Sequence, residues 1–148
     1  MDKKKHKELS DLLVYSLSRK TGKQEVFLGD IPKKLEKQIL KEGLSLPNLK
    51  VYVDSFSIRH AFNKHGVKSK RVPKGEIPVC VFDILLLPDL IKKANVLKVE
   101  KDVIKISKNE FGLIGEIVCE LRISRKKGNR IYLKTIYNKK KRLQSPFS

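Results

Sequence analysis

The stretch GEIVCELRISRKKGNRIYLKTIYN, residues 115–138, decides the fold class because it predicts two long antiparallel strands. Apolar and polar side chains alternate along 115–125, as they do in a strand with one buried face. The apolar side chains of that face are Ile117, Cys119, Leu121 and Ile123. The sequence KKGN at 126–129 is typical of a turn, and 130–138 is the returning strand. A β-hairpin is therefore predicted near the end of the chain.

The segments before this hairpin predict a second hairpin and several helices. Residues 97–107 predict a tight hairpin that turns at Lys101 and Asp102. Further upstream, hydrophobic spacing and the positions of Gly and Pro indicate the remaining elements. They are a helix over 9–19, a short β-like segment over 25–29, a helix ending at Gly43, a strand over 49–54, a short helix over 57–65 and a helical segment over 83–94. Helices first and a roughly four-stranded antiparallel sheet last make an α+β fold.

The size of the chain predicts a single domain. A length of 148 residues with 40% hydrophobic residues is enough for one folded unit over 1–148. Both ends are rich in lysine. Residues 1–8 are expected to form a basic flexible tail, and residues 139–148 a second basic tail.

Positive charge is the strongest feature of the composition. The chain has 34 Lys and Arg residues against 16 Asp and Glu residues, a formal net charge of +18 and a pI near 10.0. Such a charge attracts polyanions, of which nucleic acid is the commonest. Two alternatives stay open. The lysines can form a solvated coat without a partner, or they can form a basic face that meets an acidic protein.

Several classes of site and location are not expected. Cys80 and Cys119 are far apart in sequence and are expected to be free thiols in a reducing compartment. No Cys/His set has zinc spacing, and there is no acidic cluster, HExxH motif or P-loop, so neither a metal nor another cofactor is expected. No apolar run approaches the ~20 residues of a membrane span, and no signal peptide is recognised. The expected location is a cytoplasm, that of the producing cell or that of a target cell into which the protein is delivered.

Two of the three histidines lie in the short helix over 57–65, for which Ser55 and Ser57 are the predicted N-caps. Helical spacing divides its side chains between two faces. One face holds Ile58, Ala61, Phe62 and His65, and the other holds Arg59, His60, Asn63 and Lys64. The offset of five residues puts the two imidazoles on different faces unless the helix ends or bends at His65.

The histidine helix carries the residue types that acid–base chemistry uses. Lys64 lies one turn from His60, and a neighbouring cation favours the neutral imidazole that a general base requires. The helix dipole favours the protonated form of His65, which suits a general acid. Arg59 and Lys64 can hold a phosphate and neutralise developing charge. The alternative stays open that His65 only packs on the apolar face and that His60 is only solvated.

A second candidate patch is the sequence KTIY that begins at Lys134. On a regular strand, Thr135 and Tyr137 share a face with Ile131 and Leu133, while Lys134 points to the opposite face. A Thr and a Tyr at the end of a strand can bind phosphate or position a scissile group. The alternative is a strand that simply runs out of the core into polar surface.

Without a metal motif, the residues favour metal-independent chemistry if the chain is a nuclease. RNA is then the natural substrate, because its 2′-OH supplies an internal nucleophile. Such an enzyme needs only a base, an acid and cations that stabilise the phosphorane. The competing class is a non-catalytic basic protein that binds RNA or DNA. It explains the net charge equally well, but not the clustering of His60, Lys64 and His65.

The order of several short motifs resembles a known family. These motifs are IRHAFNKHG at 58–66, the basic loop that leads to IPV at 77–79, Asp83, the β-meander, and LKTIYN at 133–138. They are similar to the phage- and toxin-associated nuclease domains of the barnase–EndoU–colicin–RelE (BECR) group, and the similarity covers a nuclease-like core of about 49–138. The resemblance implies a pair of helices followed by a four-stranded antiparallel sheet. It also implies a metal-independent endoribonuclease, often a toxin, that acts on tRNA or other cellular RNA.

The resemblance also implies roles for individual residues. The catalytic candidates that it carries over are Arg59, His60, Lys64, His65, Thr135 and Tyr137, and it also includes Lys134 as a nucleic-acid-binding candidate. Independently of the resemblance, the cations of the basic loop, Lys68, Lys70, Arg71 and Lys74, are candidates for binding nucleic acid. His60 would deprotonate a 2′-OH, and Arg59 with Lys64 would stabilise the phosphorane. His65 or Tyr137 would protonate the leaving 5′-oxygen, which leaves a 2′,3′-cyclic phosphate. The expected partners are RNA, including tRNA, and a cognate acidic inhibitor or immunity protein; no membrane partner is expected.

Overall fold

The computed structural model describes residues 3–18, 21–44, 49–65, 76–107, 115–124, 126 and 129–140. The helices in these ranges are α1 (Lys3–Leu17), α2 (Lys33–Lys41), α3 (Ser55–His65), α4 (Val81–Leu85) and α5 (Leu87–Lys93). The strands are β1 (Glu25–Asp30), β2 (Lys50–Asp54), β3 (Glu76–Ile77), β4 (Asn95–Glu100), β5 (Val103–Ser107), β6 (Gly115–Ile123) and β7 (Arg130–Lys140). The fold class is α+β, as the sequence predicts.

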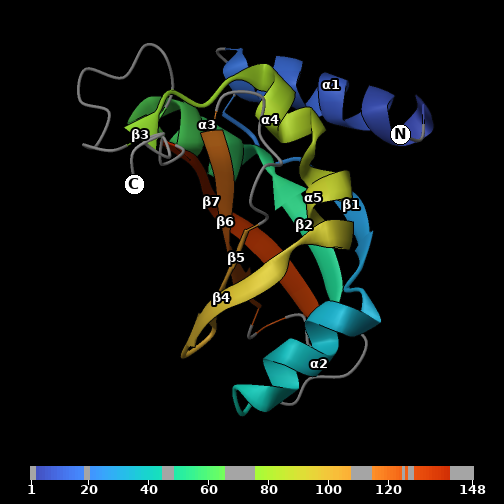
Figure 1. The fold of residues 1–148 in the computed structure, drawn as a ribbon. Helices are drawn as coiled ribbons and strands as arrows, with labels where there is room; N and C mark the ends of the chain where they lie inside the picture. The colour runs from blue at the N-terminus through green and yellow to red at the C-terminus, as the bar shows by residue number, and fades with distance from the viewer. Residues whose placement is uncertain are drawn as a thin grey trace, which may run out of the picture.

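One mixed sheet with the strand order β1-β2-β7-β6-β5-β4 forms the centre of the fold (Figure 1). Its β4–β7 part is the predicted antiparallel meander. The prediction of a roughly four-stranded antiparallel sheet is wrong in strand number and direction, because β2 adds to β7 in parallel and β1 pairs antiparallel with β2. A parallel pair joins segments that are distant in sequence, so no local pattern reveals it.

Helix α3 lies along the edge of β7 between β2 and the short β3. β2 pairs with residues 130–132 of β7, and β3 pairs with residues 138–139. Between these pairings the Ser57 hydroxyl donates a hydrogen bond to the carbonyl oxygen of Leu133. The helix therefore partly satisfies a stretch of strand edge that has no neighbouring strand. Its N-terminus lies beside the first half of β7, and its last residue, His65, lies beside the second half.

The N-terminus of α3 follows β2 without a linker. Asp54 Oδ1 accepts a hydrogen bond from the Ser57 backbone N–H at 2.8 Å, so Asp54 caps the helix in place of the predicted Ser55 and Ser57. Ser55 is already helical, and its hydroxyl bonds the Gln24 N–H and the Gly22 carbonyl, each at 3.0 Å. The two serines therefore hydrogen-bond α3 to the segment before β1 and to β7 instead of capping the helix.

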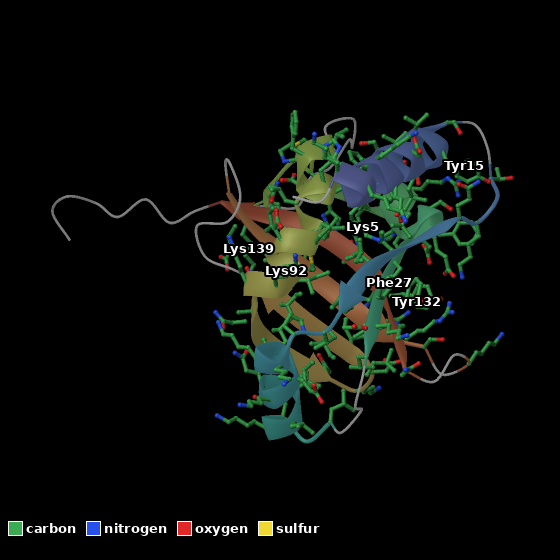
Figure 2. The ribbon with its side chains drawn as sticks, turned by 90° about the vertical axis from the view of Figure 1, so that its right-hand side faces the viewer. Lys5, Tyr15, Phe27, Lys92, Tyr132 and Lys139 are labelled. Atoms are coloured by element: carbon green, nitrogen blue, oxygen red, sulfur yellow. The ribbon has the colours of Figure 1, made fainter. Side chains whose placement is uncertain are left out.

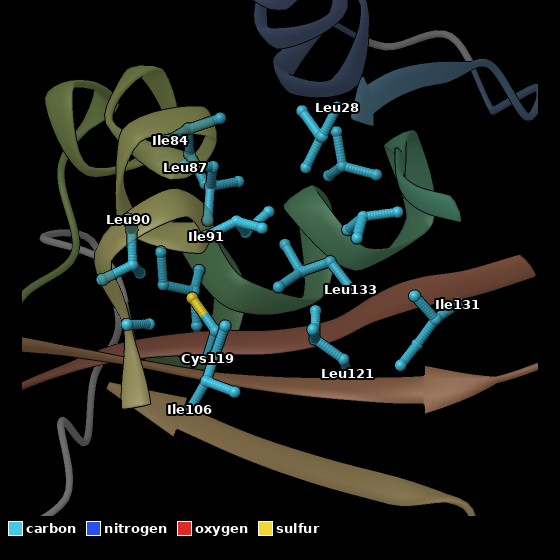
Figure 3. Packing of buried hydrophobic residues seen from close by; sticks show 14 of the residues in the cluster. Leu28, Ile84, Leu87, Leu90, Ile91, Ile106, Cys119, Leu121, Ile131 and Leu133 are labelled. Atoms are coloured by element: carbon cyan, nitrogen blue, oxygen red, sulfur yellow. The ribbon is translucent and has the colours of Figure 1, made fainter. Parts of the chain in front are cut away.

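The hydrophobic core lies between the helices and one face of the sheet (Figure 3). Figure 3 shows the apolar side chains of α4 and α5 above those of the central strands. The helical residues labelled there are Ile84, Leu87, Leu90 and Ile91, and the strand residues are Leu28, Ile106, Cys119, Leu121, Ile131 and Leu133. The alternation read from 115–125 is confirmed, because all four of its predicted apolar side chains belong to this core.

Helix α1 begins at Lys3, which corrects the predicted flexible tail over 1–8. Its buried residues include Leu9, Leu12 and Leu13. Lysine is a good helix former, so a helix anchored by these leucines extends back through the basic segment. Lys5 also ties the helix to β1, since its ammonium group bonds the Phe27 carbonyl and pairs with Glu8 at 3.4 Å.

A β-bulge interrupts the regular pairing of β7 with β6. Leu121 pairs with Leu133, but the preceding residue Glu120 pairs with Thr135. Lys134 is therefore an extra residue without a partner on β6. A single extra residue shifts the side-chain alternation of the strand by one position from that point onward.

The bulge changes which face the end of β7 presents. Ile136 takes the core position after the bulge and is fully buried. Thr135 and Tyr137 therefore project from the face opposite the core, which we call the outer face. The prediction that they share a face with Ile131 and Leu133 is wrong, because it assumed an uninterrupted strand.

Candidate active site

His65 ends α3 and is held from two sides. Its side chain is buried, with 6% of the residue exposed, and its Nδ1 lies 2.7 Å from Oε1 of Glu76 on β3. A carboxylate accepts hydrogen bonds, so Nδ1 is the donor here, and in a neutral imidazole this leaves the lone pair on Nε2. The Val79 N–H also bonds the His65 carbonyl at 2.7 Å. The two hydrogen bonds hold His65 in position at the end of α3.

Tyr137 of β7 lies next to this histidine. The ring centroids of Tyr137 and His65 are 5.6 Å apart, with 31° between the ring planes. On its other side, the ammonium nitrogen of Lys105 lies 5.6 Å from the centre of the Tyr137 ring. Lys105 comes from β5, between the buried residues Ile104 and Ile106, so it projects from the outer face. Residues from α3, β3, β5 and β7 thus meet at one place.

Lys105 is held in its charged form. A hydrogen bond with the Tyr137 side chain is the main cause that raises the pKa of Lys105 above its ordinary value of 10.5, and partial burial opposes it. The negative charges of Glu120 and Glu100 raise the pKa of Lys105 further. The site therefore contains a cation beside a phenol ring, an arrangement that can stabilise negative charge on a bound group.

Thr135 adds a hydroxyl without a partner to the same face. The residue is buried, with 6% exposed, and Oγ1 makes no hydrogen bond among the described residues. Buried hydroxyls are normally paired, so an unpaired one on the same face as Lys105 and Tyr137 is unusual. A ligand oxygen can take the missing place.

The opposite side of this strand end is anchored to α4. Asn138 Nδ2 donates to Asp83 Oδ2 at 2.8 Å, and the Cys80 N–H donates to the same oxygen at 2.8 Å. The side chains of Asn138 and Asp83 are both buried. Cys119 lies nearby in the core, where burial and the charge of Asp83 raise its pKa, so its thiol stays protonated. Both cysteines are free, as predicted, although Cys80 is only half-buried.

The structure does not bring the other residues of the predicted helix site to His65. Arg59 Nε bonds the Ser16 carbonyl at 3.0 Å, and its guanidinium group also bonds the Gly22 carbonyl at 3.2 Å. It joins α3 to α1 and to the segment before β1. His60 is exposed and projects from a different side of α3 than the buried His65, as five residues of helix require. Lys64 is exposed.

The predicted nucleic-acid-binding residues fall into two groups. Lys134 is exposed at the bulge. Lys68, Lys70, Arg71 and Lys74 lie outside the described residues.

A cleft of about 500 Å³ opens beside the first half of β7. It lies at the N-terminus of α3, and Lys134 on its wall directly precedes Thr135. Its charged and polar lining includes Lys23, Ser57, Arg122, Lys126, Tyr132 and Lys134. Asp54 and Asp102 also line it.

Sequence reasoning missed Glu76 and Lys105. Glu76 is the one carboxylate within the basic run 68–78, and this isolation was the signal that could have marked it. Lys105 alternates with two buried isoleucines, which shows its face but not its neighbour Tyr137. Among the described residues, no group of three or more His, Cys, Asp or Glu side chains is placed to hold a metal ion. Within the same ranges, no helix has both the length and the apolar character that crossing a membrane requires.

A match between the sequence and a protein-family model shows to which family the chain belongs. The model PBECR3, described as phage-Barnase-EndoU-ColicinE5/D-RelE like nuclease3, matches residues 27–145. The chain belongs to this family. The matched region includes α3, β3, β5 and β7 and so every residue of the cluster around Tyr137, whereas α1 lies before it. The predicted BECR resemblance is confirmed, and the PBECR3 domain is a nuclease domain. No curated protein and no solved structure matches the chain significantly.

Proposed function

We propose that the PBECR3 domain is an endoribonuclease that cleaves RNA by attack of a ribose 2′-OH on the adjacent phosphate. The observation that carries the proposal is the meeting of His65, Glu76, Tyr137 and Lys105 on the outer face of the sheet in a chain of a nuclease family. This cluster holds a base, a proton donor and a cation, the groups that 2′-OH chemistry requires.

His65 is the general base in this proposal. Its Nδ1–H is committed to Glu76, so the lone pair on Nε2 takes the proton of the 2′-OH. The 2′-oxygen then forms a bond to phosphorus. The carboxylate of Glu76 balances the positive charge that the ring gains. His60 was predicted for this role from its neighbour Lys64, but it lies on another side of α3 from Tyr137 and Lys105.

Tyr137 is the general acid. As the bond between phosphorus and the 5′-oxygen breaks, the phenol hydroxyl gives its proton to that oxygen. The resulting phenolate is stabilised by the ammonium group of Lys105, whose nitrogen lies 5.6 Å from the centre of the Tyr137 ring. The products are a 2′,3′-cyclic phosphate and a free 5′-hydroxyl. No metal ion takes part, because the ribose supplies the nucleophile.

Thr135 and Lys105 stabilise the phosphorane. The unpaired hydroxyl of Thr135 donates to a non-bridging phosphate oxygen, and the ammonium group of Lys105 neutralises the added negative charge. Thr135 was among the predicted catalytic residues, and the buried position of its unpaired hydroxyl supports keeping it there.

The test is cleavage of RNA in the presence of EDTA. Three substrates are compared: an unstructured RNA, a tRNA, and the unstructured sequence with 2′-deoxyribose at every position. We expect both RNAs to be cut to products with 2′,3′-cyclic phosphate ends, and the deoxy strand to stay intact. Cleavage of the deoxy strand, or loss of all cleavage in EDTA, would rule out the mechanism. Salt-sensitive retention of RNA without cleavage would favour the non-catalytic nucleic-acid-binding protein.

A further inference from the structure

Three aromatic rings form a row across β1, β2 and β7. Phe27 pairs with Tyr52, and Tyr52 pairs with Tyr132, so all three project from the same face of the sheet. The ring centroids are 5.3 Å apart for the first pair and 5.5 Å apart for the second. The neighbours of Tyr52 in β2, Val51 and Val53, are buried in the core. The aromatic row therefore lies on the outer face.

The aromatic row is open to solvent. Phe27 is 37% exposed, and Tyr52 and Tyr132 are half-buried. Figure 2 shows Phe27 and Tyr132 on the side where β1 and β2 face the viewer. Cross-strand aromatic pairs stabilise a sheet, which accounts for contact between neighbouring rings. It does not account for a third ring in line, nor for the cations around the row.

A cation lies over each ring of the row. Lys5 is 5.5 Å from the centre of Phe27 and Lys23 is 5.3 Å from the centre of Tyr132. The guanidinium carbon of Arg130 lies 4.5 Å from the centre of the Tyr52 ring. Lys5 and Arg130 also pair with carboxylates, those of Glu8 and Glu25. Among the described residues, Lys23 forms no salt bridge, so its charge is available to a phosphate.

The aromatic row continues into the cleft and toward the candidate active site. Tyr132 and Lys23 line the cleft of about 500 Å³ together with Arg122 and Lys134. Because of the bulge, Tyr132 and Tyr137 both project from the outer face of β7. Five residues of strand separate them by roughly 16 Å, a distance that a few nucleotides of extended RNA can span. Tyr132, Lys134 and Tyr137 thus follow one another along β7, and the other two rings lie beside Tyr132 on β2 and β1.

We propose that the aromatic row is a stacking platform for unpaired bases of single-stranded RNA. Every base has a π-face, so ring stacking holds a strand without requiring one sequence, while lysines beside the rings bind its phosphates. The platform holds the strand so that the backbone passes through the cleft to His65. Bases inside a duplex already stack on one another and do not use it. The choice of RNA rests on the proposed function, whereas the stacking itself is measured without cleavage.

The test measures binding of a short 2′-O-methyl RNA, whose blocked hydroxyl prevents cleavage by 2′-OH attack. Fluorescence anisotropy of the full chain gives the dissociation constant for three ligands: the single strand, the same strand with abasic positions, and the duplex. We expect the single strand to bind at least about fivefold more tightly than its abasic form, since stacking on an aromatic side chain contributes about 1–3 kcal/mol per base. Equal affinity for the intact and abasic strands overturns the proposal.

Three variants test whether the preference for bases comes from the aromatic row. Phe27→Leu combined with Tyr132→Leu removes two rings but keeps apolar cover, and we expect it to abolish most of the preference for bases. Phe82→Leu is the matched control, because Phe82 is 62% exposed on α4, away from the aromatic row. The Phe82→Leu protein should keep the same preference for the intact strand over the abasic strand as the unchanged chain. Phe27→Leu alone guards against a folding defect of the double variant. A base preference that survives in folded ring variants overturns the proposal.

The outcomes separate this inference from the proposed function. RNA cleavage at a normal rate with no base-dependent binding would remove the platform and leave the nuclease mechanism standing. Base-dependent binding that the ring variants lose, with no cleavage of natural RNA, would support the platform and remove the mechanism.

Discussion

The two halves of β7 differ in how completely their polar groups are paired. In residues 130–133, Arg130 pairs with Glu25 and lies over Tyr52, and the Leu133 carbonyl is bonded by Ser57. In residues 135–138, Thr135 Oγ1 and Asn138 Oδ1 are buried without a hydrogen-bond partner among the described residues. Unpaired buried groups cost free energy, so a protein retains them where they serve function. This difference agrees with the proposals that the first half of β7 binds RNA and that the second half belongs to the reaction centre.

The largest effect is expected from removing the imidazole of His65 beside the second half of β7. We expect His65→Ala to lower the rate of RNA cleavage by ~10²–10⁴, because the general base is lost. Affinity for the 2′-O-methyl strand should change little, since the aromatic row and the cleft are untouched. Single-turnover cleavage and anisotropy measure the two quantities. His60→Ala is the matched variant on the exposed side of α3, and an equal loss there would return the base role to His60.

Thr135→Val removes the unpaired hydroxyl at nearly constant volume. We expect cleavage to fall by ~10²–10³ because a donor to the phosphorane disappears. The free energy of unfolding should stay the same or increase, since no hydrogen bond of the free protein is lost. Urea unfolding and cleavage rates are measured on the same preparation. A variant that is less stable but equally active would show that the hydroxyl has a structural role instead.

Lys105→Met tests the cation at Tyr137. We expect a loss of about 10-fold to 10²-fold in cleavage, the size of a hydrogen bond to a charged group. The pKa of Lys105 is raised from 10.5, so its charge is present below that value and is lost only as the pH rises above it. The ratio of the cleavage rate of the unchanged chain to that of Lys105→Met should therefore be constant between about pH 6 and 9. A ratio that changes over this range would mean that another group titrates in the role given to Lys105.

Arg59→Met should have the smallest effect on cleavage, although Arg59 was predicted to be catalytic. Its hydrogen bonds to the Ser16 and Gly22 carbonyls join α3 to α1, so we expect the free energy of unfolding to fall by about 1–2 kcal/mol. Cleavage under folding conditions should remain close to that of the unchanged chain. A large loss of cleavage at unchanged stability would restore the predicted role in stabilising the phosphorane.

Local sequence patterns were sufficient to predict most helices and strands, but not how these elements pair and pack in the fold. Alternation in 115–125 and the turn at Lys101 and Asp102 predicted three of the four strands of the meander, because strand period and turn chemistry act over a few residues. The parallel pairing of β2 with β7 could not be predicted in this way, since nothing near Val51 indicates Ile131 as its neighbour. The capping role of Asp54 was also missed, because the serines after it have the same propensity.

Prediction of the candidate site from the sequence has the same limit, because its residues come from segments that are distant in sequence. The sequence suggested that His65 and the end of the last strand work together, and the structure brings His65 and Tyr137 side by side. The face of Thr135 was predicted wrongly, because the bulge at Lys134 depends on pairing with β6 and leaves no mark in the local alternation. Glu76 and Lys105 come from other strands, so only the assembled sheet brings them to Tyr137.

The central position of β7 has a consequence for the protein during its synthesis on the ribosome. Ribosomes release a chain from its N-terminus, so β1, β2 and α3 emerge long before the strand that lies between β2 and β6. Until β7 emerges, the sheet remains two unjoined parts, and His65 has no Tyr137 beside it. A nascent chain therefore lacks a complete centre until β7 has emerged, and under the proposed function it would not cleave the RNA around it before that point.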